Sequence, residues 1–121
     1  MTRLGKLAAG LTIIVASLTL AGCGNDDSND GDTAPRTIEV TFKGDTMAPN
    51  GERVEVTHGQ DVTLHVTADA PGEIHVHSTP EQEFEYDAGE TTLTITDLDQ
   101  PGVVDVESHS LDKVIVQLEV R

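Results

Sequence analysis

The feature that most constrains this chain is a regular alternation of apolar and polar residues, which begins near Thr37 and continues almost to the C-terminus. Successive side chains of a β-strand point to opposite faces of its sheet, so a period of two is typical of strands with one buried face. The alternating segments are residues 38–42, 54–56, 62–66, 74–76, 93–95, 104–106 and 114–120.

Turn-forming residues separate these segments. Gly, Pro and Asn often reverse or interrupt a strand, and they occur here at Pro49-Asn50-Gly51, Pro71-Gly72 and Pro101-Gly102. The 3.6-residue period of an amphipathic helix is not kept for more than about two turns anywhere after Thr37. The pattern therefore predicts an all-β sandwich of seven to eight short strands.

Composition excludes several classes of function. A chain of 121 residues is expected to form one small domain. It holds 22 Asp and Glu against 7 Lys and Arg, for a formal charge of −15, so we do not expect it to bind nucleic acid. The chain has a single Cys, whereas a disulfide framework, a multi-thiolate zinc site or an iron–sulfur cluster needs several sulfurs. We also expect a monomer.

The N-terminus is typical of a secretory signal. Arg3 and Lys6 precede an apolar run over residues 7–20, which is shorter than the roughly 20 residues that cross a bilayer as a helix. The run ends in Leu20-Ala21-Gly22-Cys23, which resembles the bacterial lipobox. The resemblance implies cleavage before Cys23 and lipidation of its thiol, which would anchor the protein to the extracytoplasmic face of the cell membrane. The alternative is an ordinary signal peptide followed by an incidental cysteine.

Three segments follow from this interpretation: a lipoprotein signal peptide over residues 1–22, a lipidated acidic tether over 23–36 and a folded domain over 37–121. Cleavage would leave 5 basic and 22 acidic residues, a charge of −17. The tether combines dense negative charge with almost no apolar residues, so we expect it to be disordered. Acyl chains, rather than charge, would supply the affinity for the membrane.

Two histidine patterns in the folded domain carry the best candidate chemistry. His75 and His77 alternate with apolar residues, so both imidazoles should emerge from one face of a strand. Glu107 and His109 repeat the spacing in a later segment. A set of imidazoles with one carboxylate suits Cu(II) or Zn(II), and a strongly negative field attracts cations. The alternative is polar packing, in which histidines form hydrogen bonds with carboxylates on neighbouring strands.

The order of these segments resembles the cupredoxin-like domain of small bacterial lipoproteins. The resemblance rests on Glu73-Ile74-His75-Val76-His77, on the turn Pro101-Gly102, and on the strand that leads to Glu107-Ser108-His109. It implies a Greek-key β-sandwich of the copper-protein type. A blue-copper site needs a Cys thiolate with two His, and none remains once Cys23 is lipidated, so we do not expect electron transfer through such a site.

Other residues offer weaker chemistry. We expect His58 and His65 to be surface residues, Met47 to be a packing residue, and Asp97 and Asp99 to form a turn. No nucleophile motif or phosphate loop is present, so we expect a protein that is not an enzyme.

Two hypotheses therefore remain for the function. One is a lipid-anchored cupredoxin-like module that binds a divalent transition metal, with copper favoured over zinc, for storage or delivery. The other is a metal-free interaction or structural domain of the cell envelope. The second hypothesis predicts an exposed apolar or aromatic patch, for instance around Phe84 and Tyr86, although both rings are also suited to filling the core.

Overall fold

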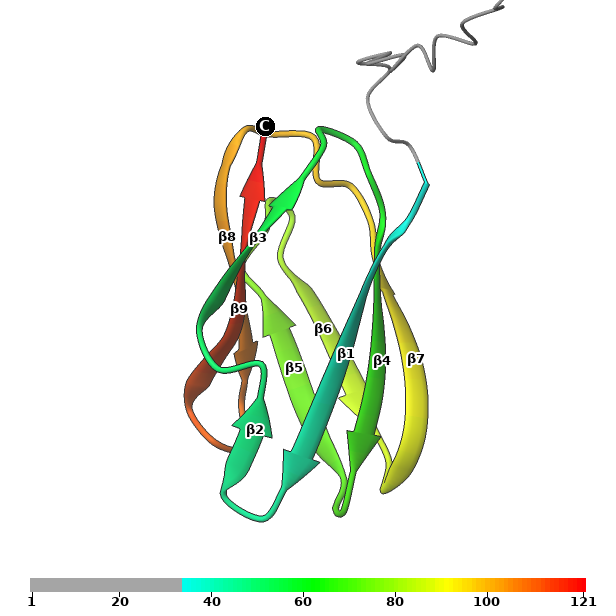
Figure 1. The fold of residues 1–121 in the computed structure, drawn as a ribbon. Coiled ribbons are helices and arrows are strands. Elements are labelled where there is room, and N and C mark those ends of the chain that lie inside the picture. Colours follow the sequence, from blue (N-terminus) through cyan, green and yellow to red (C-terminus); the bar gives the residue numbers. More distant parts are fainter. Residues whose placement is uncertain (1–33) are drawn as a thin grey trace, which may run out of the picture.

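The computed structural model describes residues 34–121, which form a sandwich of two β-sheets (Figure 1). One sheet contains, in spatial order, β2 (Thr46–Ala48), β1 (Arg36–Lys43), β4 (Val62–Ala68) and β7 (Gly89–Ile95). The other contains β3 (Glu52–Val56), β9 (Lys113–Val120), β8 (Gly102–Ser108), β5 (Gly72–Val76) and β6 (Gln82–Tyr86). The predicted signal peptide, Cys23 and most of the predicted tether lie outside the described residues.

The predicted all-β Greek-key sandwich is confirmed, but it has nine strands rather than seven to eight. Two strands lie outside the seven alternating segments: β6, and β2, which is only three residues long. Its pairing with β1 forms a hairpin through Gly44, which adopts a φ of 56°. Within residues 34–121, no helix has the length and apolarity needed to cross a bilayer.

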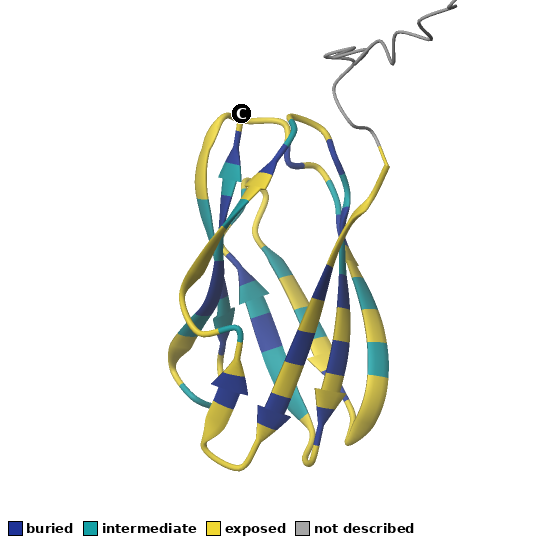
Figure 2. Ribbon diagram, viewed as in Figure 1, coloured by how far each residue is buried: buried dark blue, intermediate teal, exposed yellow. Residues whose placement is uncertain are grey.

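The core lies between the two sheets and consists mainly of aliphatic side chains. Figure 2 shows buried and exposed positions alternating along β1 and β4, as a period of two requires. The ring of Tyr86 supplies aromatic bulk and stacks on Phe42 of the opposite sheet, with ring centroids 5.0 Å apart and planes 3° from parallel. Met47 is buried in the same core, so the prediction that it is a packing residue is confirmed.

The register of β5 against β8 determines which polar groups meet on the outer face of the second sheet. These antiparallel strands place Ile74 opposite Ser108, and Val76 opposite Val106, with all four side chains buried. His75 then lies opposite Glu107 on the solvent-facing side. The predicted outward direction of the histidines is therefore confirmed, because the residues that alternate with them are fully buried.

Near the C-terminus, Arg121 joins β9 to β3 through two carboxylates. Its guanidinium lies 2.9 Å from Glu55 and 2.8 Å from Glu119. The hydrogen bond from Arg121 lowers the pKa of Glu119 below its usual value of about 4.5. A lowered folded-state pKa contributes stability that is present above the unfolded pKa and is lost as pH falls through the folded value.

We therefore expect Arg121→Gln to lower the free energy of unfolding more at pH 7 than at about pH 3, because the contribution of this ion pair is lost as pH falls through the folded pKa of Glu119. Urea unfolding of the two proteins at both pH values measures this difference. An equal loss of stability at both pH values would contradict the assigned ion pair.

Candidate metal centre

The outer face of β6, β5 and β8 carries a dense array of titratable side chains. Because these strands are adjacent and antiparallel, the outward residues of each strand form rows across the sheet. The array contains three imidazoles and six carboxylates: Glu73, His75, His77, Glu81, Glu83, Glu85, Asp105, Glu107 and His109. This concentration of negative charge favours the binding of cations.

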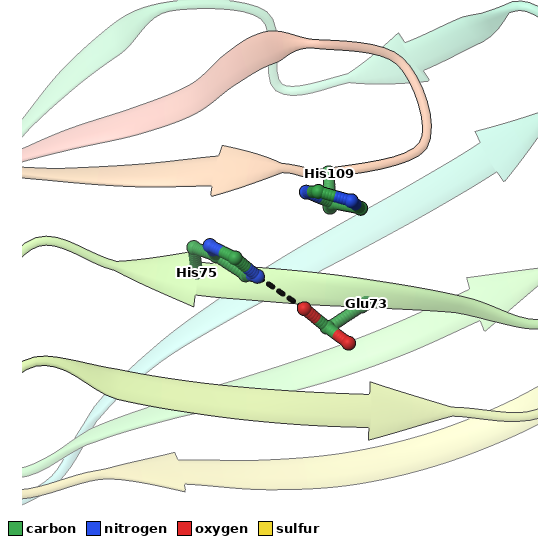
Figure 3. Close-up of side chains that lie close together, drawn as sticks. All are labelled: Glu73, His75 and His109. Atoms are coloured by element: carbon green, nitrogen blue, oxygen red, sulfur yellow. Dashed lines mark hydrogen bonds and ion pairs between the residues drawn. The ribbon is translucent and has the colours of Figure 1, made fainter.

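At one end of the array, His75, His109 and Glu73 converge (Figure 3). One ligand atom from each residue lies within 4.8 Å of the other two. The rings of His75 and His109 stack with centroids 4.9 Å apart and planes 17° from parallel. Nε2 of His75 is hydrogen-bonded to Glu73. The His75 side chain is only 20% exposed, so the centre lies partly within the protein surface.

The backbone holds two of these residues directly beside each other. His109 lies in the turn just after β8, and its N–H donates to the carbonyl oxygen of Glu73 at 3.0 Å. This bond continues the β5–β8 ladder by one step, so the His109 ring emerges beside Glu73 and close to His75.

His77 and Glu107 form a separate pair beside this centre. Nε2 of His77 lies 3.0 Å from Glu107 Oε2, and Nδ1 lies 3.7 Å from Glu81. The two ring nitrogens therefore face different carboxylates on opposite sides of the ring. The His75 and His77 ring centroids are 6.5 Å apart.

A diagonal arrangement of side chains explains this division. Glu107 is directly opposite His75 in the ladder, yet its carboxylate reaches His77, which lies just after the end of β5. In the same diagonal sense, His75 contacts His109, which lies just after the end of β8. Long side chains on antiparallel strands can reach their diagonal neighbours. His75 and His77 therefore each contact a diagonal neighbour rather than the residue directly opposite on β8.

The four residues predicted from the sequence are thus neighbours, but they do not form one group of converging ligands. The structure places His75 with His109, and His77 with Glu107. The carboxylate beside the two converging imidazoles is Glu73, which is not among the ligands predicted from the sequence. Its position two residues before His75 on the same strand face was the available signal.

Electrostatics at this centre are dominated by the carboxylates around His75. The hydrogen bond with Glu73 is the largest effect, and it raises the pKa of His75 above its ordinary value of 6.5. Burial of the ring acts in the opposite direction, and the charges of Glu73, Glu83 and Glu81 add smaller increases. A raised His pKa contributes stability below the unfolded pKa, and this is lost as pH rises through the folded value.

We expect Glu73→Gln to lower the pKa of His75 in the metal-free protein more than Glu83→Gln does, because only Glu73 is hydrogen-bonded to the ring. NMR titration of the His75 ring protons measures both changes. The difference in free energy of unfolding between Glu73→Gln and the wild type should become smaller as pH rises through the folded pKa of His75. Equal shifts in the two variants would refute the assigned partner.

The donors suit some metals and exclude others. Two imidazoles with a carboxylate fit Cu(II) or Zn(II), which hold such donors about 2.0–2.2 Å away. A blue-copper centre needs a Cys thiolate, and the described residues, 34–121, contain no cysteine. The buried residue just before His109 is Ser108, whose Oγ accepts a hydrogen bond from the Leu111 N–H at 3.3 Å.

The remaining polar candidates do not join the centre. His65 is exposed and pairs with Glu39 at 3.0 Å on the other sheet, and His58 is exposed beside Gly59, as predicted. Asp97 lies in a segment without regular structure and adopts a φ of 57°, which Asp tolerates better than most residues.

The aromatic patch expected of an interaction domain is not found at Phe84 and Tyr86. Tyr86 is only 6% exposed, and Phe84 packs against the core. Among the residues that the structure describes, the exposed large apolar side chain is Val103. Single exposed apolar residues are common on proteins and do not by themselves indicate a docking surface.

No protein-family model matches the sequence, and a search of the curated proteins gives no match. Solved structures of copper proteins do match. A purple cupredoxin from Nitrosopumilus maritimus has a TM-score of 0.52 and 14% identity, over 71% of this chain and 99% of that one. A blue copper oxidase from Nitrosomonas europaea has a TM-score of 0.52 and 14% identity over 73% of this chain, which spans 44% of the oxidase. A variant of amicyanin with Cu(I) has a TM-score of 0.50 and 13% identity, over 70% of this chain and 82% of that one.

These likenesses show that the sandwich has the cupredoxin fold. The expectation of a cupredoxin-like domain is therefore confirmed at the level of fold. At these identities the comparisons do not extend to the ligands of any metal, which have to be argued from this chain's own residues.

Proposed function

We propose that this cupredoxin-fold domain binds a divalent transition metal, with Cu(II) favoured over Zn(II), through His75, His109 and Glu73. The observation that carries the proposal is the convergence of their three ligand atoms within 4.8 Å of one another. Ligands about 2.0–2.2 Å from a metal are about 3–4 Å from each other. Small side-chain rotations would therefore close the set around an ion.

Copper is favoured on chemical grounds. Divalent first-row metals bind nitrogen and oxygen sites with an affinity that peaks at Cu(II). Imidazole and carboxylate donors suit the cupric ion, whereas Cu(I) prefers sulfur. When bound, the ion would be held by residues that are partly open to solvent, which suits storage or delivery better than electron transfer. We propose binding without catalysis.

His77 and Glu107 belong to the proposal as neighbours of the metal rather than as its main ligands. His75 and His77 each already contact a carboxylate: His75 contacts Glu73, and His77 lies 3.0 Å from Glu107. A metal needs a deprotonated ring nitrogen on His75, so protons compete with the metal and affinity should fall as the pH becomes acidic. Glu81 and Glu83 place ligand atoms within 4.8 Å of one another and of His75, and with the remaining carboxylates they would attract the ion.

The location of the domain is also part of the proposal. The lipobox-like sequence supports a protein anchored through a lipid on Cys23 at the extracytoplasmic face of the membrane. A metal-binding domain there would meet ions that arrive from outside the cytoplasm.

Calorimetric titration of the purified protein with Cu(II), and separately with Zn(II), tests the proposed ligands. We expect one saturable site, which binds Cu(II) more tightly. His75→Ala and His109→Ala should each weaken it by at least about ten-fold, because even partners outside the ligand shell typically contribute 10–100-fold. His77→Ala should have a smaller effect, and His65→Ala, on the other sheet, should have none.

The absence of saturable binding in the wild type would refute the proposed function. Equal affinity of His75→Ala and the wild type would refute the ligand set. If His77→Ala loses more affinity for Cu(II) than His109→Ala does, the metal is bound at His77 and Glu107 instead.

A further inference from the structure

The turn that carries His109 is attached to the sandwich at several points. Besides the bond from the His109 N–H to Glu73, the Leu111 N–H donates to the buried Ser108 Oγ at 3.3 Å. The hydroxyls of Tyr86 and Ser110 provide a third attachment: both oxygens lie within 3.0 Å of one point, the position that a Cβ would take at Gly72, and Ser110 acts on the Tyr86 phenol as a hydrogen-bond partner. Of these three attachments, the one between Tyr86 and Ser110 joins the turn to β6, the strand on the other side of β5.

The Tyr86 ring is held rigidly by the core. It is 6% exposed and stacks on Phe42 of the opposite sheet at a centroid distance of 5.0 Å. Burial also raises the pKa of the Tyr86 phenol, so the hydroxyl remains protonated across the neutral range. A rigid, protonated hydroxyl is well suited to fix the position of an exposed turn.

Gly72 provides the space through which this hydroxyl reaches the turn. A Cβ at position 72 would overlap the Tyr86 hydroxyl and would lie 3.0 Å from Ser110 Oγ. Gly72 immediately precedes Glu73, and Ser110 immediately follows His109. The hydroxyl pair therefore lies beside both segments that supply ligands to the candidate metal centre.

We propose that Tyr86 is a positioning residue of the metal centre, which holds His109 against His75 through its hydrogen bond to Ser110. This proposal rests on the proposed function. His109 and Ser110 are both exposed, so packing in the core does not hold the His109 ring in place. A turn that is ordered before the metal arrives loses less conformational entropy on binding.

The test compares Tyr86→Phe, Ser110→Ala and the double variant with the wild type. Tyr86→Phe removes one oxygen and keeps the ring on Phe42, whereas Ser110→Ala changes an exposed residue and does not disturb the core. We expect each single variant to weaken Cu(II) binding about five-fold, the usual net effect of one hydrogen bond. The double variant should lose no more than either single variant, because both remove the same interaction.

Two controls separate positioning from a general loss of stability. Ser110→Thr keeps the hydroxyl and should retain wild-type affinity. Ser78→Ala, in the turn between β5 and β6, removes a hydroxyl that donates to the Pro80 carbonyl, and it should leave affinity unchanged. In the metal-free protein, Tyr86→Phe and Ser110→Ala should weaken the NMR cross-peaks between the rings of His75 and His109.

The outcomes distinguish this proposal from the proposed function. If the wild type binds Cu(II) and the Tyr86 and Ser110 variants bind equally well, or if their losses are additive, the positioning role is refuted and the metal site stands. If the wild type does not bind, the metal site is refuted. The ring cross-peaks then decide the positioning role, because unchanged cross-peaks in Tyr86→Phe overturn it.

Discussion

The pairing of β5 with β8 is the constraint on which the candidate centre depends. Two buried pairs hold the register, Ile74 opposite Ser108 and Val76 opposite Val106. A slip of one residue would turn these side chains to solvent and the histidines into the core, so the hydrophobic effect specifies the register strongly. The same register places the His109 N–H against the carbonyl of Glu73. Burial of the apolar residues on the inner face therefore fixes the positions of the polar residues on the outer face.

The fold and the ligand chemistry of this protein point in different directions. The sandwich has the cupredoxin fold, whereas a blue-copper centre requires a Cys thiolate and the described residues, 34–121, contain no cysteine. The residue just before His109 is a buried serine, whose hydroxyl closes the following turn. The donors of the candidate centre are nitrogen and oxygen, which supports the proposed binding of Cu(II) rather than electron transfer.

Much of the fold was predictable because alternation reports directly on which face of a strand is buried. The outward direction of His75 and His77 followed from the buried residues between them. The identity of their partners was not predictable in this way, because it depends on the register between strands and on diagonal contacts across the sheet. Glu73 was overlooked for this reason, although it shares a strand face with His75. The short β2 was missed because three residues are too few to establish a period.

The most direct test of this account is a crystal structure of the copper-soaked protein with anomalous diffraction at the copper edge. The account predicts one strong anomalous peak about 2.0–2.1 Å from a ring nitrogen of both His75 and His109, with a Glu73 oxygen as a third ligand. A peak bound instead by His77 and Glu107, or no peak on the outer face of β5 and β8, would contradict it.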